Sequence, residues 1–251
     1  MKLPSGPVAP APDAPQVLAE ASKGCRGIRS LSAEVRVAGK VNGERLRGKL
    51  LVGVAAPASA RIEATAPFGA PVFILVANHN DATLYIPRDD RVLEHGHTDQ
   101  VVEALTGVPL SAEELLPALT ACWAVDAVVR TAEQRGPDWR VIAVLPDHML
   151  TLHRDSAAAP WRIVSVLRNL EHSGRRWVAE YRDVANDLPR SIKIVSADAE
   201  SHGTYDLTLS LSQVALNESL GPEVFRVDIP RSAHPMTLDE LQRARPGVRE
   251  N

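Results

Sequence analysis

Histidines next to carboxylates are the residues of this sequence that could do acid–base or metal chemistry. His95 and His97 flank a single glycine and offer two imidazole ligands, but no third ligand accompanies them. Asp147–His148 and His153–Asp155 could each orient an imidazole, yet no Gly-x-Ser-x-Gly turn supplies a nucleophile. Walker and Gly-x-Gly-x-x-Gly loops are absent from the sequence too. We therefore expect no catalytic residue, no metal, no cofactor, and a protein that is not an enzyme.

Composition narrows the class of protein further. The chain has 251 residues, of which 45% are hydrophobic and 4% aromatic, which suits one large all-β domain, or as an alternative two small ones, with an aliphatic core. Its 28 basic and 31 acidic residues give a net charge of −3, so no basic face for nucleic acid is expected. No apolar run reaches the roughly 18 residues of a membrane-spanning helix. The first residues lack the apolar core of a signal peptide, so the protein is either cytosolic or has lost a leader.

The two cysteines, Cys25 and Cys122, leave two interpretations open. Their separation excludes a zinc site, which needs closely spaced ligands. They are either two small buried residues or a disulfide formed in an oxidising compartment.

Three parts of the chain differ in pattern. Residues 1–13 are rich in proline without apolar periodicity, which predicts an extended tether. Residues 14–236 are expected to form one domain that starts with a helix, because Asp13 can cap it and Pro15 suits its first turn. Residues 237–251 are expected to be a short helical or disordered tail at the periphery.

Most of the predicted domain alternates apolar and polar residues with a period of two. This pattern is typical of antiparallel strands with one face in water. The charged face carries residues such as Arg36 and Lys49, and the turn at Asn42-Gly43 joins the first two strands. The apolar face and the tryptophans that start four later strands supply candidates for lining a cavity: Val35, Val37, Leu46, Leu50, Ile62, Ile74, Leu84, Trp123, Trp139, Trp161 and Trp177.

The number of strands predicts how the sheet is covered. About a dozen antiparallel strands must curl, split or close. Helices are expected near residues 15–25, 99–119 and 237–243, and these are too small to fill a wide concave face, which predicts a cavity beneath them. A two-sheet sandwich would bury the same alternation without a cavity, and stays an alternative.

Two short motifs resemble those of a known family. Leu105-Thr106-Gly107-Val108-Pro109 matches a helix-joining Leu-Thr-Gly-x-Pro stretch, and Pro67-Phe68-Gly69 is similar to a strand-joining Pro-Leu-Gly loop. Both resemble the LolB family of outer-membrane lipoprotein receptors, within the wider LolA-like fold. The segment from Phe225 to Pro230 is closer to other LolA-like proteins than to LolB. The resemblance implies a mainly β fold, a strongly curved antiparallel open half-barrel of about 11 strands with helices over its concave face.

The resemblance also implies a function. It predicts an outer-membrane lipoprotein facing the periplasm, anchored by an N-terminal lipid, which holds acyl chains of lipoproteins or lipids and helps localise them. A periplasmic carrier protein is a further candidate partner. In the family, the loop side chain at Phe68 protrudes into the membrane, and Pro67 and Gly69 favour that turn, whereas without the family a Phe tucked under the sheet is expected. The rival hypothesis is a structural or assembly lipoprotein that uses the same fold, with a filled interior, as an interaction platform.

An acyl chain suits aliphatic walls on physical grounds. Each buried methylene contributes about 0.8 kcal/mol, so a chain of about 16 carbons offers on the order of 10 kcal/mol in total. Walls without charge pairs bind such a chain unspecifically and release it to a membrane that offers the same gain.

Overall fold

The computed structural model describes residues 7–66, 71–123, 126–145, 147–170, 175–196 and 204–244. Within these ranges the chain forms fifteen strands and four α-helices, so the predicted mainly β class is confirmed, with more strands than the 11 or so expected. The chain divides into two compact units, which are described separately. Unit 1 comprises Met1–Gly27 and Pro117–His202, and unit 2 comprises Ile28–Leu116 and Gly203–Asn251.

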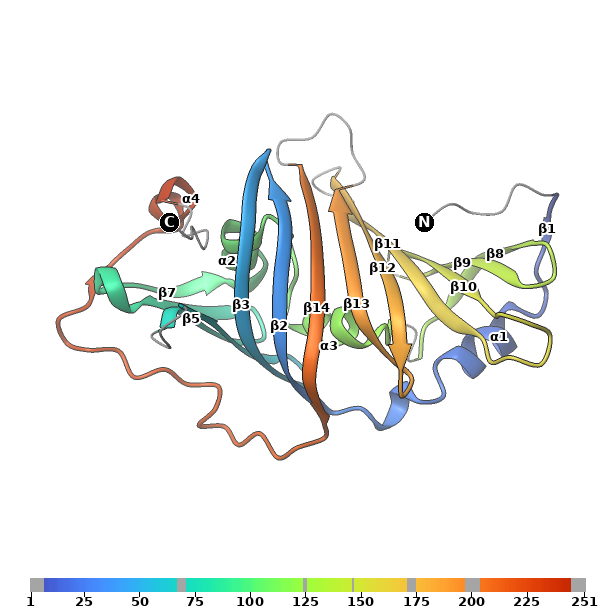
Figure 1. Cartoon of the computed structure of the whole chain (residues 1–251), viewed down its shortest axis with the longest axis horizontal. Helices are drawn as coiled ribbons and strands as arrows, with labels where there is room; N and C mark the ends of the chain where they lie inside the picture. The colour runs from blue at the N-terminus through green and yellow to red at the C-terminus, as the bar shows by residue number, and fades with distance from the viewer. Residues whose placement is uncertain are drawn as a thin grey trace. The chain divides into compact units, whose positions relative to one another are not determined.

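Unit 2 contains an open sheet with the strand order β14-β2-β3-β4-β5-β6-β7-β15. Its strands are antiparallel except for the parallel pair of β15 with β7. In chain order they are β2 (Ser30–Val41), β3 (Glu44–Ala55), β4 (Ser59–Thr65), β5 (Pro71–Asn78), β6 (Asp81–Ile86), β7 (Arg91–His97), β14 (Tyr205–Leu216) and β15 (His234–Pro235). Figure 1 shows the long strands β14, β2 and β3 side by side.

The register of β2 with β3 follows the alternation in the sequence. Val35 lies opposite Leu50 and Arg36 opposite Lys49, so one face of the hairpin is apolar and the other charged. Val35 is buried whereas Arg36 is exposed. The Asn42-Gly43 turn has positive φ at both residues, which is the geometry of a type I′ hairpin.

Two helices of unit 2 pack against each other, and one of them also packs on the sheet. α2 (Thr98–Thr106) contacts β6, β7 and α4 (Leu238–Ala244). Leu241 of α4 is fully buried, so the predicted tail helix exists but is not peripheral. A short 3-10 helix, η2 (Pro87–Asp89), joins β6 to β7.

The start of the next helix is stabilised as its sequence predicts. α3 (Ala112–Thr120) follows Ser111, whose backbone N–H donates to Glu114 Oε2 at 3.0 Å. This contact is one half of the capping box that the Ser111–Glu114 spacing indicates. The chain passes from unit 2 to unit 1 within α3.

Unit 1 has its own run of neighbouring strands, in the order β1-β8-β9-β10-β11-β12-β13. The described pairs among them are antiparallel. The elements are β1 (Val8–Pro10), α1 (Ala14–Ala21), η1 (Cys25–Gly27), β8 (Val129–Arg135), β9 (Trp139–Val144), β10 (His148–His153), β11 (Arg162–Leu170), β12 (Arg175–Ala185) and β13 (Leu188–Ser196).

The Pro-rich start of the chain is more ordered than a tether. Val8–Pro10 forms β1 and pairs with β8 at the end of the strand order, where a proline is tolerated because one side of an edge strand needs no N–H donor. Ala11 is buried. Residues 8–11 therefore belong to unit 1, while the predicted boundaries at residues 13, 14 and 236 stay predictions.

A disulfide joins the N-terminal segment of unit 1 to the segment that follows α3. Cys25 in η1 is bonded to Cys122, just after α3, with a Cα–Cα distance of 5.4 Å. Of the two interpretations that the sequence allowed, the bridge is the one observed, and it suits an oxidising compartment. In the described part of the chain, no helix is both long and apolar enough to cross a membrane.

Candidate functional site

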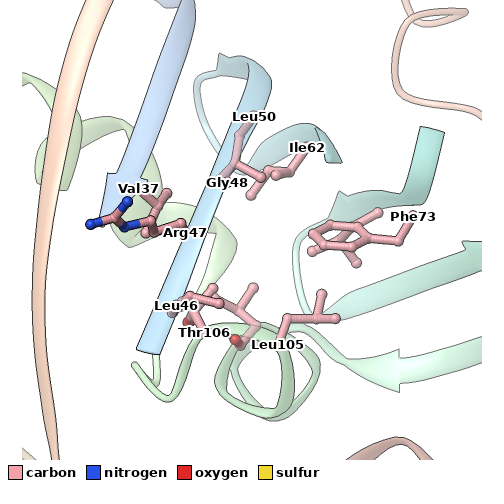
Figure 2. A pocket seen from close by; sticks show the side chains of 11 residues that line it. Val37, Leu46, Arg47, Gly48, Leu50, Ile62, Phe73, Leu105 and Thr106 are labelled. Atoms are coloured by element: carbon pink, nitrogen blue, oxygen red, sulfur yellow. Dashed lines mark hydrogen bonds between the residues drawn. The ribbon is translucent and has the colours of Figure 1, made fainter. Parts of the chain in front are cut away.

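The candidate site is a small apolar pocket in unit 2, between the inner face of the sheet and α2 (Figure 2). Strands β2 to β5 form one wall, and the last residues of α2 form the other. Its volume is about 60 Å³, well below the roughly 300–1,000 Å³ of typical ligand pockets. The lining residues are Val37, Leu46, Arg47, Gly48, Leu50, Ile62, Phe73, Leu75, Val102, Leu105 and Thr106.

The chemistry of this lining is almost entirely non-polar. Thr106 is its one hydroxyl, and Oγ1 donates to the carbonyl of Val102 at 2.8 Å, as Ser and Thr side chains do within helices. Arg47 is the one charged residue of the lining, at a strand position whose side chain alternates toward the outer face. The pocket therefore suits a ligand without a charge, held by dispersion and apolar burial.

Four predicted lining residues line this pocket: Val37, Leu46, Leu50 and Ile62. Two more share their face without reaching it. Val35 pairs with Leu50 and is 2% exposed, and Leu84 pairs with Leu75 and is fully buried. Both are ordinary core.

Two predicted lining residues lie on the wrong face. Ile74 pairs with Glu63 on the outer face of β5, whereas its neighbours Phe73 and Leu75 line the pocket. The prediction was wrong because an unbroken apolar run does not reveal which alternate residues face inward. Trp139 pairs with His153, with ring centroids 4.1 Å apart, on the face of β9 opposite the buried Ile142.

Trp161 is held in unit 1 by charged groups rather than by a cavity. The guanidinium carbons of Arg140 and Arg154 lie 4.9 and 4.7 Å from the centre of its ring. Arg140 in turn donates to both carboxylate oxygens of Asp13, at 3.0 and 2.7 Å. These hydrogen bonds lower the pKa of Asp13, against an opposing effect of burial. Arg140 thus connects Trp161 to Asp13, the residue before α1.

Trp123 and Trp177 meet in a polar–aromatic cluster of unit 1. The structure places Trp123 in a turn rather than in the strand predicted to start there, which begins at Val129. Its ring lies 5.8 Å from that of Trp177 and 4.9 Å from that of His148, and its Nε1 donates to the hydroxyl of Tyr181. Trp177 is fully buried, and its Nε1 has no partner within the described residues.

Two members of this cluster have shifted pKa values. Burial, and secondly the nearby Arg168 guanidinium, lower the pKa of His148 to about 4, with Asp147 opposing them. Burial raises the pKa of the Tyr181 hydroxyl, while the Trp123 hydrogen bond opposes this shift. His148 is therefore neutral at neutral pH. The cluster could not be predicted from spacing, because its members come from a turn and two separate strands.

The remaining candidate residues from the sequence are the loop at Pro67–Gly69 and the histidines His95 and His97. Pro67, Phe68 and Gly69 lie outside the described residues. His95 Nδ1 lies 3.2 Å from Asp81 Oδ1, while His97 Nδ1 lies 2.7 Å from Asn80 Nδ2, so the two imidazoles have different neighbours. Among the described residues, no three His, Cys, Asp or Glu side chains are grouped as a metal site would require.

Sequence reasoning missed the pocket's second wall. Val102 and Leu105 come from α2, and Leu105 opens the Leu-Thr-Gly-x-Pro motif that was used only as a family signature. Gly107 ends α2 with φ of +82°, and a Cβ there would lie 2.9 Å from Val41 Cγ1. The motif therefore seats the end of α2 against the end of β2, beside the pocket.

Comparisons with known proteins bear on the fold. No family model matches the sequence, and no curated protein does either. A LolA superfamily protein from Nitrosomonas europaea superposes with a TM-score of 0.57 at 14% identity, covering 85% of this chain and 97% of that one. The domain of a putative outer-membrane lipoprotein-sorting protein from Vibrio parahaemolyticus has a TM-score of 0.51 at 11% identity, covering 84% and 94%. The chain therefore has the LolA-like fold, as the resemblance of its motifs predicted.

Proposed function

We propose that this protein is a non-enzymatic carrier or receptor of the bacterial cell envelope, which binds acyl chains of lipoproteins or lipids at the α2 pocket. We further propose that it acts at the outer membrane, facing the periplasm, and helps to localise these lipids there. A lipid anchor, a periplasmic carrier that hands over cargo, and a membrane role for the Pro67–Gly69 loop are parts of the same proposal.

The apolar lining of the pocket carries this proposal. Its wall joins aliphatic side chains from four strands to those of α2, and offers no specific hydrogen bond to a ligand. The disulfide between Cys25 and Cys122 fits an oxidising compartment such as the periplasm. The similar structure from Vibrio parahaemolyticus is described as a lipoprotein-sorting domain, which agrees with acyl chains as cargo.

The small size of the pocket favours the rival function, a platform for protein assembly. A volume of about 60 Å³ is too small for a whole acyl chain, so binding requires the side chains of α2 to give way. If they do not, the fold serves as a platform for protein assembly with a filled interior. Acyl binding separates the two functions.

Adjacent leucines on β3 provide a matched pair of variants. Leu50 lines the pocket, while Leu51 is 44% exposed on the opposite face. We expect Leu50→Gln to weaken binding of a fluorescent fatty acid at least tenfold, because it places an amide in the apolar wall, and Leu51→Gln to leave binding unchanged. Leu105→Gln, on the helix side of the same pocket, should weaken binding as Leu50→Gln does.

Circular dichroism and urea unfolding establish that each variant is folded before its affinity is compared. The Leu105 variant keeps the test decisive if Leu50→Gln fails to fold, because Leu105 is only partly buried on a helix. Equal affinities of wild type and both pocket variants would refute the pocket as the acyl site.

A further inference from the structure

Basic residues gather on the outer face of the β2–β3 hairpin. The basic residues of this face are Arg36 and Lys40 on β2 and Arg45, Arg47 and Lys49 on β3. Cross-strand pairing brings Arg36 opposite Lys49 and Lys40 opposite Arg45. All five are exposed. A chain with a net charge of −3 therefore carries a locally cationic face on two adjacent strands.

The two ends of this face differ in how their charge is balanced. Glu34 lies 2.6 Å from Lys49 Nζ and 3.9 Å from Arg36 Nε, so it offsets the cations nearer the middle of the strands. Lys40, Arg45 and Arg47 make no ion pair and no side-chain hydrogen bond with any described residue. Near the hairpin turn three cations thus face a single carboxylate, that of Asp206, which lies opposite Lys40 on β14.

These three cations share a groove of about 430 Å³. Asp206 and Thr208 of β14 complete the groove, together with Ala38 and Gly39 of β2. A Cβ at Gly39 would collide with the carbonyl oxygen of Asp206, so β2 and β14 approach closely there. The groove provides one carboxylate against three cations, which favours anionic ligands.

The groove lies next to the apolar pocket along β3. Arg47 belongs to the lining of both, and Leu46 and Gly48 on either side of it line the pocket. Thr65, at the end of β4, pairs with Lys49, and Pro71, at the start of β5, pairs with Thr65. Both strand ends therefore lie level with Lys49, at the end of the sheet that also carries the basic residues. An apolar pocket and a cationic groove therefore lie near the same end of unit 2, on opposite faces of β3.

We propose that the Lys40–Arg45–Arg47 groove docks this end of unit 2 on an anionic lipid surface by binding the phosphates of its headgroups. The choice of a lipid surface over another polyanion rests on the proposed function, because an acyl chain for the neighbouring pocket comes from a membrane. Juxtamembrane Lys and Arg side chains bind anionic bilayers additively, each strengthening binding about fivefold.

The test is co-sedimentation of the full chain with vesicles. We expect binding to equal parts of phosphatidylcholine and phosphatidylglycerol, none to phosphatidylcholine alone, and loss of binding in high salt. Lys40→Gln/Arg45→Gln should weaken the partition coefficient about 30-fold. The control, Lys23→Gln/Arg88→Gln, removes one Lys and one Arg that are also exposed but lie outside the groove, and should bind as wild type does.

Acyl binding distinguishes this inference from the proposed function. Neither Lys40 nor Arg45 lines the apolar pocket, so their double variant should bind the fluorescent fatty acid as wild type does. The inference is overturned if both double variants lose vesicle binding equally, or if wild type ignores the anionic lipid. It is also overturned if wild type binds inorganic phosphate but does not sediment with anionic vesicles, since the groove would then be a site for a single free anion.

Discussion

Acid should destabilise the fold through His148. Its pKa is about 4 in the folded chain and about 6.5 ordinarily, so the unfolded chain binds the proton more tightly and stability falls as pH drops below about 6.5. Because one pKa unit is worth about 1.36 kcal/mol, the full difference of about 2.5 corresponds to about 3.4 kcal/mol in the free energy of unfolding. Near pH 5 the loss is about 2 kcal/mol, as an upper bound because part of the ring contacts solvent.

The assay is urea unfolding at about pH 7.5 and about pH 5, for wild type and His148→Gln. Wild type should lose up to about 2 kcal/mol more than His148→Gln between the two pH values. His234→Gln is the control, because this exposed side chain makes no hydrogen bond or ion pair with the described residues, and it should follow wild type. Identical pH dependence of wild type and His148→Gln would refute the assignment of a buried neutral imidazole.

Two further predictions concern stability. The Cys25–Cys122 bridge spans 97 residues, so replacing both cysteines by serine should lower the free energy of unfolding by about 4 kcal/mol, and a reductant should destabilise wild type but not this variant. Gly107→Ala should destabilise unit 2 by about 2 kcal/mol, because the φ of Gly107 is +82° and a Cβ there would meet Val41. Gly43→Ala is the control: Gly43 has the same φ but open space around it, so this variant should lose about half as much stability. Equal losses in urea unfolding would contradict the contact with Val41.

Period-two alternation made most of unit 2 predictable. The strands between Ser30 and Thr65 each have one apolar face and one face rich in charged residues, so both the strands and their inward faces could be predicted. The run from Val72 to Ala77 has no such alternation, and Ile74 was therefore assigned to the wrong face. The same face error applies to Trp139, because a tryptophan at the start of a strand does not by itself indicate which face of the strand lines a cavity.

Long-range features were not predictable from spacing. The bridge between Cys25 and Cys122 depends on where α3 ends relative to η1, which no local pattern reports. Strand β1 was missed because prolines argue against a strand unless it lies at an edge. The cluster around His148 and Trp177 depends on the register of β10, β11 and β12, which brings distant residues onto one face.

Only part of the pocket lining could be predicted, because the end of a helix forms the wall opposite the strands. Val37, Leu46, Leu50 and Ile62 followed from alternation, whereas α2 presents Val102 and Leu105 at a three-residue spacing. The described pocket, at about 60 Å³, is smaller than a cavity for a whole acyl chain.

Native mass spectrometry of the protein purified from membranes tests acyl binding most directly. Our account predicts a population heavier than the polypeptide by the mass of a lipid or acyl species, and loss of that population in Leu50→Gln but not in Leu51→Gln. A protein that carries no lipid, and takes up none when incubated with phospholipid vesicles, would contradict the account.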